Sequence, residues 1–484
     1  MMPQPATPKI VPLCVDLDGT LLKTDLLFES MARLLRQRPW MALLVPFWLL
    51  AGKAALKRNL ARHISLNPAL LPYNDEFLEW LSAEKERGRE IFLTTAADET
   101  LARAVGRHLG IFTEIIASDG RRNLKGSRKL AALREAIPGD FEYAGDSPTD
   151  FNVWQGSSGA VLVNASRGLA ARVRKSVPVV RTFERGKPRW KDYLRALRVH
   201  QWSKNVLIYV PLITSHRLLN DRLLLKATVG AVLFSLCSSA QYILNDLIDL
   251  EADRHHATKR LRPFASGALS IPAGFFMSVG LLALSLGAAC LFSPLLALLL
   301  ATYFILSLSY SLYLKKILLL DVFILAGLYT FRIVVGLLTI NGDFSAWLLA
   351  FALFLFLSLA FGKRSAELRS ARRHSTAIHG RGYEPDDLAQ VNLFGVSSAY
   401  LSAVVFILYL QSERVRELYK QPELLWLLSP VYLYWISRIW MLASRGAVHE
   451  DPVIFVLKDR TTYLVGLISG LIMIAAASWG FGFH

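Results

Sequence analysis

Cysteine is scarce in this chain, with only Cys14, Cys237 and Cys290 among 484 residues. Two of the three lie inside apolar runs, so neither a disulfide framework nor a structural zinc site is expected. Internal repeats and low-complexity tracts are also lacking. Residues 1–10 carry one charge and lead directly into a strand-like run, which is not the pattern of a cleavable signal. We therefore expect the N-terminal part of the chain to stay in the cytoplasm.

Acidic residues are few relative to basic ones. The chain has 38 Asp and Glu against 55 Lys and Arg, which gives a formal net charge of +17. With 53% hydrophobic residues and a mean hydropathy of +0.35, part of the chain must lie in lipid. In membrane proteins an excess of Lys and Arg gathers in cytoplasmic loops, so we attribute the charge to membrane topology and expect no nucleic-acid partner.

Apolar residues are unevenly distributed along the chain. Short apolar runs alternate with charged residues in the first part, whereas long apolar stretches recur from Asn205 almost to the C-terminus. We predict a soluble domain over residues 1–179, a basic linker over residues 180–193 and a membrane domain over residues 194–484. The linker is rich in Arg and Lys and suits the anionic headgroups of a bilayer surface.

Nine apolar stretches in the membrane domain are close to the length that crosses about 30 Å of hydrocarbon. They cover residues 205–215, 223–246, 271–292, 295–314, 317–338, 346–361, 391–410, 424–442 and 464–479. With the N-terminus in the cytoplasm, the loops after the even-numbered stretches are the richest in Lys and Arg. The positive-inside rule then predicts a multi-pass protein of the inner (cytoplasmic) membrane, with the C-terminus outside.

The soluble domain has the pattern of an α/β protein. Strand-like runs over residues 10–15, 89–93 and 141–144 are separated by helical patterns, as in a parallel sheet. A helical insert over residues 26–87 is expected to form a cap. Within it, residues 39–56 are unusually apolar, and we expect an interfacial or cap helix, with a re-entrant segment as the alternative.

Pairs of carboxylates follow two of these strands. Asp16 and Asp18 come directly after the first strand, at the edge of the sheet where open α/β folds bind ligands. One carboxylate can attack phosphorus while the other protonates the leaving oxygen and then activates water. Asp146 and Asp150 follow the third strand. We expect these four acids to hold one Mg²⁺.

Hydroxyl and ammonium groups that could hold phosphate oxygens complete this set. Thr94, with Thr95 as the alternative, follows the second strand, and Lys129, preferred over Lys125, begins a helix predicted over residues 128–136. The ordered set resembles the haloacid dehalogenase (HAD) superfamily over about residues 10–176. Its second Asp resembles the phosphatase branch, and a scaffold that has lost activity is the alternative.

Three acids end the second apolar stretch. Asp246, Asp249 and Asp253 follow Asn245 with a spacing that places all three on one face of a continuous α-helix. Like charges so arranged repel each other, and a shared divalent cation removes the conflict. We therefore expect at least one Mg²⁺ here, with its remaining positions taken by a diphosphate substrate.

Basic residues follow at once, and Lys259, Arg260 and Arg262 can pair with phosphate oxygens. The pattern from Asn245 to Arg262 resembles the UbiA-type intramembrane prenyltransferase superfamily. That family's nine-helix architecture matches the apolar stretches over residues 194–484. The resemblance implies group transfer on a polyprenyl lipid.

One departure from the general family is informative. Aromatic prenyltransferases carry a second Asp-rich motif after the sixth stretch, where this chain has Lys363, Arg364 and Glu367 in a basic segment. Positive charge suits a substrate with a further phosphate, and the segment resembles the branch typified by decaprenyl-phosphate phosphoribosyltransferase. The same resemblance implies substrate-binding roles for Lys204, Asn205, Tyr310, Lys315, Asp321 and Lys458. For Lys315 and Lys458 the alternative is topological charge alone.

These resemblances give one leading hypothesis. The membrane domain transfers 5-phosphoribose from phosphoribosyl diphosphate to a polyprenyl phosphate of decaprenyl type, and the HAD domain removes the 5-phosphate. The product is polyprenyl-phosphoryl ribose for envelope glycans. The alternatives are an aromatic or quinone-precursor prenyltransferase using polyprenyl diphosphate, and a non-catalytic lipid-binding or transport protein. A homo-oligomer is an alternative to a monomer.

Overall fold

The chain is represented by a computed structural model that describes residues 11–119, 122–184, 186, 188–373, 382–447, 455–456 and 458–478. The chain divides into two compact units. The first unit contains Met1–Val199 and Tyr242–Gly280, and the second contains His200–Gln241 and Leu281–His484. The first unit therefore includes the segment with the three acids that end the second apolar stretch.

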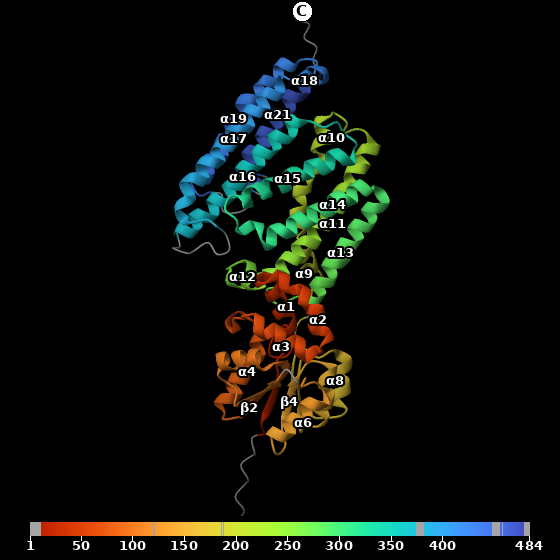
Figure 1. Cartoon of the computed structure of the whole chain (residues 1–484), viewed down its shortest axis with the longest axis vertical. Coiled ribbons are helices and arrows are strands. Elements are labelled where there is room, and N and C mark those ends of the chain that lie inside the picture. Colours follow the sequence, from red (N-terminus) through yellow and green to blue (C-terminus); the bar gives the residue numbers. More distant parts are fainter. Residues whose placement is uncertain are drawn as a thin grey trace, which may run out of the picture. The chain divides into compact units, whose positions relative to one another are not determined.

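A six-stranded parallel sheet with the order β3-β2-β1-β4-β5-β6 is the centre of the first unit (Figure 1). Its strands are β1 (Leu13–Asp16), β2 (Ile91–Asp98), β3 (Glu114–Ser118), β4 (Glu142–Gly145), β5 (Gly159–Val163) and β6 (Val179–Phe183). The three predicted strands are confirmed as β1, β2 and β4. Residues 180–183, assigned to the linker from the sequence, belong to β6 because their backbone pairs with β5.

The strands are buried on both faces, as expected for a parallel sheet. Leu13 and Val15 pack into one core, whereas Cys14 packs into another. The first core contains residues of α4 (Asp75–Glu86) and α5 (Glu99–Leu109). The second contains residues of α6 (Ser127–Ala136), α7 (Phe151–Gln155) and α8 (Arg167–Arg174). The predicted α/β fold is confirmed.

The insert between β1 and β2 is helical, as predicted for the cap. It consists of α1 (Leu26–Gln37), η1 (Pro39–Leu44), α2 (Val45–Leu50), α3 (Lys53–His63) and η2 (Pro68–Leu70), followed by α4. Asp25 caps α1 by accepting a hydrogen bond from Leu27 N at 2.7 Å. The apolar part of the insert forms η1 and α2, six residues each, which are far shorter than the roughly 20 residues of a membrane span. Trp40, Phe47 and Leu50 are exposed there.

The remainder of the first unit holds the acidic segment. It includes the end of α11 (Asp221–Ile248), α12 (Leu250–His255), η5 (Lys259–Leu261) and the start of α13 (Ile271–Phe292). The expectation of one continuous helix through all three acids is wrong. α11 ends at Ile248, and Asp249 is the N-cap of α12 with φ −95° and ψ 14°. Asp249 thus lies at a helix boundary, with Asp246 in α11 and Asp253 in α12.

The second unit is helical. Besides parts of α11 and α13 it contains α14 (Pro294–Leu312), α15 (Leu320–Thr339), α16 (Ala346–Arg373), α17 (Leu388–Leu410), α19 (Leu428–Ser444) and α21 (Arg460–Ser478). Shorter elements are η4 (Val199–Tyr209), α10 (Val210–Thr214), η6 (Leu314–Lys316), η7 (Pro385–Asp387), α18 (Glu413–Leu418) and η8 (Pro422–Leu427). The short α9 (Trp190–Leu197) precedes η4 in the chain and belongs to the first unit.

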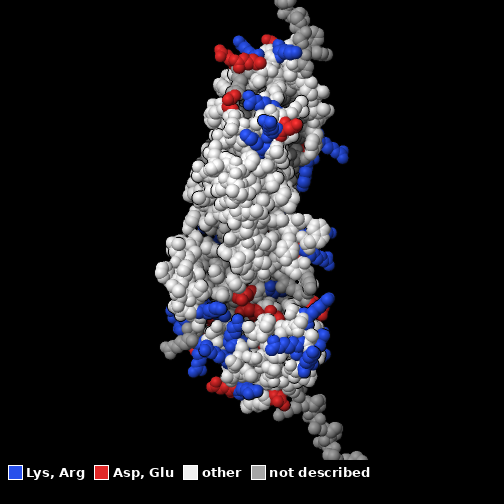
Figure 2. Space-filling view, turned by 90° about the vertical axis from the view of Figure 1, so that its right-hand side faces the viewer, with Lys and Arg blue, Asp and Glu red and all other residues white. Residues whose placement is uncertain are grey.

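Among the described residues, seven helices are long and apolar enough to cross a membrane: α11, α13, α14, α15, the helix over residues 346–372, the helix over residues 385–410, and α21. The predicted count of nine is not confirmed. The stretch over residues 205–215 forms the end of η4 and the short α10, and that over residues 424–442 forms η8 and α19, which has 17 residues. Figure 2 shows a broad band over the helices of the second unit that is almost free of charged side chains, with Lys, Arg, Asp and Glu gathered near its upper end. Such a surface suits lipid.

Close backbone packing in the second unit depends on Gly336 of α15. A Cβ at this position would lie 2.1 Å from the carbonyl oxygen of Ile208, so any side chain forces two backbones apart. Gly327 in the same helix has nothing within 4 Å of its Cβ position. We predict that Gly336→Ala destabilises the protein in detergent by about 1–3 kcal/mol. Gly327→Ala is the control and leaves stability unchanged or slightly increased.

Thermal unfolding of the two purified variants, followed by intrinsic fluorescence, checks this prediction. Equal unfolding midpoints for Gly336→Ala and Gly327→Ala would contradict the contact between α15 and η4.

Candidate active sites

The carboxyl ends of β1 and β4 bring acids together at one edge of the sheet. β1 pairs with β4 in register, so Asp16 ends one strand beside the Gly145 end of the other. Carboxylate oxygens of Asp16, Asp146 and Asp150 all lie within 4.8 Å of one another. These are three of the four acids predicted to hold a metal. The three acids meet at the edge of the sheet that the sequence predicts.

Asp18 has a different position from the other three. Its Oδ1 accepts a hydrogen bond from Leu26 N at 2.8 Å, at the start of α1, and the carboxylate is not part of the three-acid group. Directly after the second acid of the motif, Gly19 has a φ of +79°, and a Cβ there would lie 2.3 Å from Asp146 Oδ2. The turn therefore requires glycine. The position of Asp18 beside the three-acid group therefore suits proton transfer better than metal binding.

Lys129 is the lysine that contacts the predicted nucleophile. Its Nζ lies 2.8 Å from Asp16 Oδ1, 3.3 Å from Asp150 Oδ1 and 2.8 Å from Tyr143 Oη, and the residue is 4% exposed. Tyr143 also donates to Asp150 Oδ1 at 2.8 Å. Tyr143 is not among the predicted site residues, because it lies in a buried strand and carries no motif signal. Lys125 lines the cavity described below.

Thr94 is fully buried in β2 and opposite Asp16 in the strand register. Its Oγ1 has no hydrogen-bond partner among the described residues. Thr95 Oγ1 instead accepts from Ala97 N at 3.0 Å. Thr94 is therefore the better of the two candidates for a phosphate donor.

The crowded carboxylates have strongly shifted pKa values. Burial, with the charge of Asp150, raises the pKa of Asp16 to about 6 against the effect of Lys129. Burial and neighbouring acids raise the pKa of Asp18 and Asp146 to about 8 each. Against its own burial, the pKa of Asp150 is lowered by Lys129, Tyr143 and Ser147. Oxygen ligands forced together in this way fit a bound Mg²⁺, whose charge relieves the repulsion.

A cavity of about 450 Å³ opens in front of these acids. Lys57 of the cap helix α3 lines it, and its Nζ donates to Ala96 O at 2.6 Å. The cavity is also lined by Ser270, Ile271 and Pro272, the last two at the start of α13. These residues belong to the same compact unit as the sheet. The start of an apolar helix long enough to cross a membrane is therefore part of the wall of this cavity.

The second group of acids is arranged around arginine side chains. Arg262 Nη1 lies 3.0 Å from Asp246 Oδ1 and 2.6 Å from Asp253 Oδ2, and Arg198 also pairs with Asp246. Asp249 pairs instead with Arg36 Nη1 of α1 at 2.8 Å. Asp249 therefore has an arginine partner of its own, whereas Asp246 and Asp253 share Arg262. Burial raises the pKa of Asp253, despite the nearby Arg262.

Asp246 and Asp253 fit a divalent cation by their donor set. Both carboxylates are 3% exposed, and both meet one positively charged nitrogen, so their oxygens converge on a position that favours a cation. Of the predicted phosphate-binding residues, Arg262 is in contact with these acids. Lys259 and Arg260 are exposed on η5, and Asn245 is half-buried near the end of α11.

Lys204 and Asn205 lie in the second unit and are buried. Asn205 donates to Ser235 Oγ at 2.8 Å and accepts from Arg332 Nε at 3.0 Å. The Lys204 ammonium lies 5.4 Å from the ring centroid of Tyr329. This network joins η4, α11 and α15 through buried polar groups.

Asp321 and Arg364 form a second buried network in this unit. Both residues are 0% exposed, and Arg364 Nη2 lies 2.7 Å from Asp321 Oδ2. Tyr383 donates to Asp321 Oδ1 at 2.6 Å, and Arg364 pairs with Glu367. Full burial and mutual pairing favour a structural role for Asp321 and Arg364. Of the remaining candidates, Tyr310, Lys315 and Lys363 are half-buried and Lys458 is exposed. Part of the basic segment, residues 374–381, lies outside the described residues.

Two families of known proteins match different parts of the chain. Residues 207–436 match the UbiA prenyltransferase family, and residues 13–154 match haloacid dehalogenase-like hydrolases. The chain belongs to the UbiA prenyltransferase family and carries a HAD-like hydrolase domain at its N-terminal end. Its family and its apolar helices show that it is an integral membrane protein. Both of its domains match families of enzymes, which supports an enzymatic function.

Named relatives share either the whole architecture or one part of it. A Sinorhizobium fredii protein, y4nM, is 41% identical over 463 residues, 95% of this chain and 89% of that protein. Nodulation protein NoeC of Azorhizobium caulinodans is 36% identical over 290 residues, 58% of this chain and 92% of that protein. Decaprenyl-phosphate phosphoribosyltransferase of Corynebacterium glutamicum is 36% identical over 189 residues, 38% of this chain and 57% of that protein. A solved UbiA homolog from Archaeoglobus fulgidus covers 59% of this chain and 97% of its own, with 17% identity and a TM-score of 0.46.

The position of Lys129 gives a direct prediction. Lys129→Met removes the cation between Asp16 and Asp150 and should lower kcat for p-nitrophenyl phosphate by at least about 100-fold, because a buried charge at the reacting carboxylate is lost. Lys125→Met is the matched control and should retain activity within about threefold. Steady-state hydrolysis by the purified full-length protein measures both. Equal losses in the two variants would contradict the assignment of Lys129.

Proposed function

We propose that the membrane domain transfers 5-phosphoribose from phosphoribosyl diphosphate to a polyprenyl phosphate, and that the HAD domain then removes the 5-phosphate. The product is polyprenyl-phosphoryl ribose, a sugar donor for cell-envelope glycans. Similarity to the decaprenyl-phosphate phosphoribosyltransferases supports the first activity. The observation that carries the pairing of the two activities is the start of α13 in the wall of the phosphatase cavity.

In the transfer step, Asp246 and Asp253 would hold Mg²⁺, which supplies positive charge for the departing diphosphate. Arg262 and Arg198, already beside these acids, are placed to pair with phosphate oxygens. The bond from ribose C1 to the diphosphate oxygen breaks, and an oxygen of the lipid phosphate forms a bond to C1. Pyrophosphate leaves with the bonding electrons, and the arginines stabilise its charge.

In the phosphatase step, Asp16 attacks the phosphorus while Lys129 holds the carboxylate and the phosphoryl oxygens. Asp16, Asp146 and Asp150 would hold Mg²⁺, which neutralises the phosphate charge during attack. Asp18, fixed by Leu26 N, donates a proton to the leaving ribose oxygen. It then takes a proton from the water that hydrolyses the aspartyl phosphate, and inorganic phosphate is released.

The cavity wall supports a membrane-anchored phosphate as the substrate of this second step. A phosphate on a lipid headgroup stays close to the bilayer, so its phosphatase must place the nucleophile near the end of a membrane span. Ile271 and Pro272 begin such a span and line the cavity of Asp16. The exposed Trp40, Leu43 and Phe47 of the cap suit contact with the interfacial layer. Fusion of the domains also raises the effective concentration of the product at the second site.

Lys and Arg residues in the loops after the even-numbered apolar stretches support a cytoplasmic location of both sites, with the C-terminus outside the inner membrane. We also propose the domain limits expected from the sequence, except that the soluble domain extends through the end of β6 at Phe183.

Mass spectrometry of lipid products tests the proposed function. Purified protein given polyprenyl phosphate, phosphoribosyl diphosphate and Mg²⁺ should form polyprenyl-phosphoryl ribose. Asp16→Asn should accumulate the 5-phosphorylated lipid at an unchanged rate of transfer, because the nucleophile of the second step is lost. Asp253→Asn should reduce transfer by at least about 100-fold, and removal of Mg²⁺ by EDTA should stop both steps.

A prenylated phenol formed from polyprenyl diphosphate would replace this proposal with the aromatic prenyltransferase alternative. Loss of transfer in Asp16→Asn would contradict the division of labour between the domains.

Ser270 tests the role of the cavity wall. Its Oγ accepts from Ala273 N at 3.4 Å near the start of α13, and Asp and Asn both preserve such a cap. We predict that Ser270→Asp, which adds a negative charge to the wall, slows dephosphorylation of the lipid-linked 5-phosphate by about fivefold to tenfold. The neutral Ser270→Asn should have little effect.

Dephosphorylation rates in nanodiscs, measured beside hydrolysis of soluble p-nitrophenyl phosphate, give the comparison. Identical rates on the lipid substrate for Ser270→Asp and Ser270→Asn would show that the lipid-linked phosphate does not come close to this wall of the cavity.

A further inference from the structure

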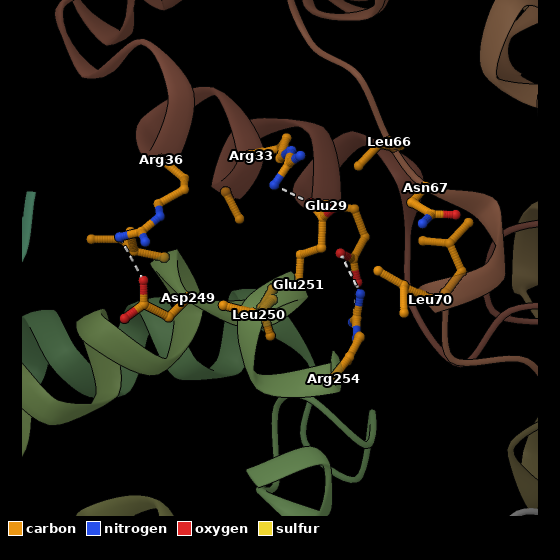
Figure 3. Close-up of a pocket in the computed structure, with 14 residues that line it drawn as sticks. Glu29, Arg33, Arg36, Leu66, Asn67, Leu70, Asp249, Leu250, Glu251 and Arg254 are labelled. Atoms are coloured by element: carbon orange, nitrogen blue, oxygen red, sulfur yellow. Dashed lines mark hydrogen bonds and ion pairs between the residues drawn. The ribbon is translucent and has the colours of Figure 1, made fainter. Parts of the chain in front are cut away.

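A small cleft of about 50 Å³ lies between α1 of the phosphatase domain and the acidic segment around α12, both in the first unit. Figure 3 shows that Glu29, Arg33 and Arg36 project from α1 toward the acidic segment, and that Asp249 and Arg254 lie opposite them. Positions 29, 33 and 36 are spaced so that they share one face of a helix. The cleft is therefore formed by two charged faces from regions that belong to different family domains.

Three ion pairs cross this cleft. Glu29 and Arg254 are joined by two contacts of 2.6 and 3.0 Å, and their side chains are 4% and 8% exposed. Arg33 pairs with Glu251, and Arg36 Nη1 lies 2.8 Å from Asp249 Oδ1. The order of charges on α1 is complementary to that on the opposite segment. This complementarity fixes the register of α1 against the acidic segment.

The ion pair between Asp249 and Arg36 extends to the third acid a feature that the other two share. Each of the three acids that end the second apolar stretch has an arginine partner: Asp246 has Arg198 and Arg262, Asp253 has Arg262, and Asp249 has Arg36. Two of these arginines, Arg198 and Arg262, lie close to the acids in a site that the proposed function assigns to a diphosphate. Arg36 comes from the phosphatase domain, more than 200 positions away in the chain, yet it occupies the equivalent place at the third acid.

Charge balance suggests what this arrangement does. When a carboxylate exchanges a guanidinium for Mg²⁺, the freed guanidinium needs a new anion, and a diphosphate bound to the same Mg²⁺ supplies one. Arginine suits this exchange because its planar group pairs with phosphate oxygens as well as with carboxylates. The side chains of Arg36 and Asp249 are 22% and 24% exposed, so both can change partner without leaving a fully buried charge.

We propose that Arg36 of the phosphatase domain is a binding residue of the diphosphate site in the membrane domain. Asp249 exchanges Arg36 for Mg²⁺ when Mg²⁺-diphosphate binds, and Arg36 then pairs with the phosphate oxygens. The inference rests on the proposed function for the presence of a diphosphate, but it does not depend on the ribose. Helix α1 is thereby a component of both active sites, since its first turn also holds Asp18 through Leu26 N.

Binding of inorganic pyrophosphate tests the proposal without any ribosyl substrate. Calorimetry on the full-length protein in nanodiscs, with Mg²⁺ present, should show that Arg36→Gln weakens pyrophosphate binding by about tenfold, the value of one charge-assisted contact. Arg36→Lys should recover most of the affinity. Arg38→Gln is the matched control, because Arg38 ends the same helix, is exposed, and should be without effect. Binding that survives Asp253→Asn is subtracted as binding at the phosphatase site.

A second measurement separates binding from simple docking of α1. Mn²⁺ binding without pyrophosphate, followed by electron paramagnetic resonance, should be as tight or tighter in Arg36→Gln, because Asp249 loses a competing cation. Unchanged pyrophosphate affinity in Arg36→Gln would overturn the proposal. Parallel loss of Mn²⁺ and pyrophosphate binding would also overturn it and would make Arg36 a structural residue. Failure of ribosyl transfer with the expected pyrophosphate results would overturn only the proposed function.

Discussion

Repulsion between carboxylates that are partly removed from water is the constraint on which both sites depend. Each site gathers aspartates that cannot all stay ionised in a poorly solvated place unless cations compensate them. At the edge of the sheet the compensation comes from Lys129, with Tyr143 as a hydrogen-bond donor. At the acidic segment it comes from arginines that belong to distant parts of the chain. Both arrangements are suited to exchange with Mg²⁺ and phosphate, which carry the same types of charge.

The first unit is more than a soluble domain attached to a membrane protein. Its compact body includes the end of α11, all of α12 and the start of α13, so the acidic segment packs with the cap of the phosphatase. Helix α1 lies between the two sites. Its twelve residues span roughly 18 Å, with Asp18 bound near its first residue and Asp249 bound near its last turn. A rigid element of this length physically connects the places where the two proposed reactions occur.

Comparison with relatives separates what is shared from what is particular to this architecture. The decaprenyl-phosphate phosphoribosyltransferases match 38% of this chain, whereas y4nM of Sinorhizobium fredii matches 95%. The ion pairs from α1 to α12 need both domains in one chain, so they are a property of the fused architecture. In this respect the phosphatase domain contributes contacts to the acidic segment beyond its own chemistry.

Features that depend on local pattern could be predicted from the amino-acid sequence. Apolar periodicity gave the α/β domain and seven of the membrane helices, and the turn after β1 gave Asp16 and Asp18 because a motif and its strand are neighbours in the chain. The sequence also identified Lys129, the second residue of a predicted helix. Short elements such as η4 and η8 were less predictable, since composition does not reveal where an apolar run breaks into shorter helices.

The pairing of charges that are distant in the chain depends on the tertiary structure. Nothing in the local sequence shows that Arg36 pairs with Asp249, that Tyr143 supports Asp150, or that the start of α13 lines the cavity of Asp16. The break at Asp249 was equally hidden, because the spacing of the three acids is compatible with a continuous helix. Such contacts arise from the way the chain folds back on itself, where the low dielectric of a packed interface selects opposite charges as partners.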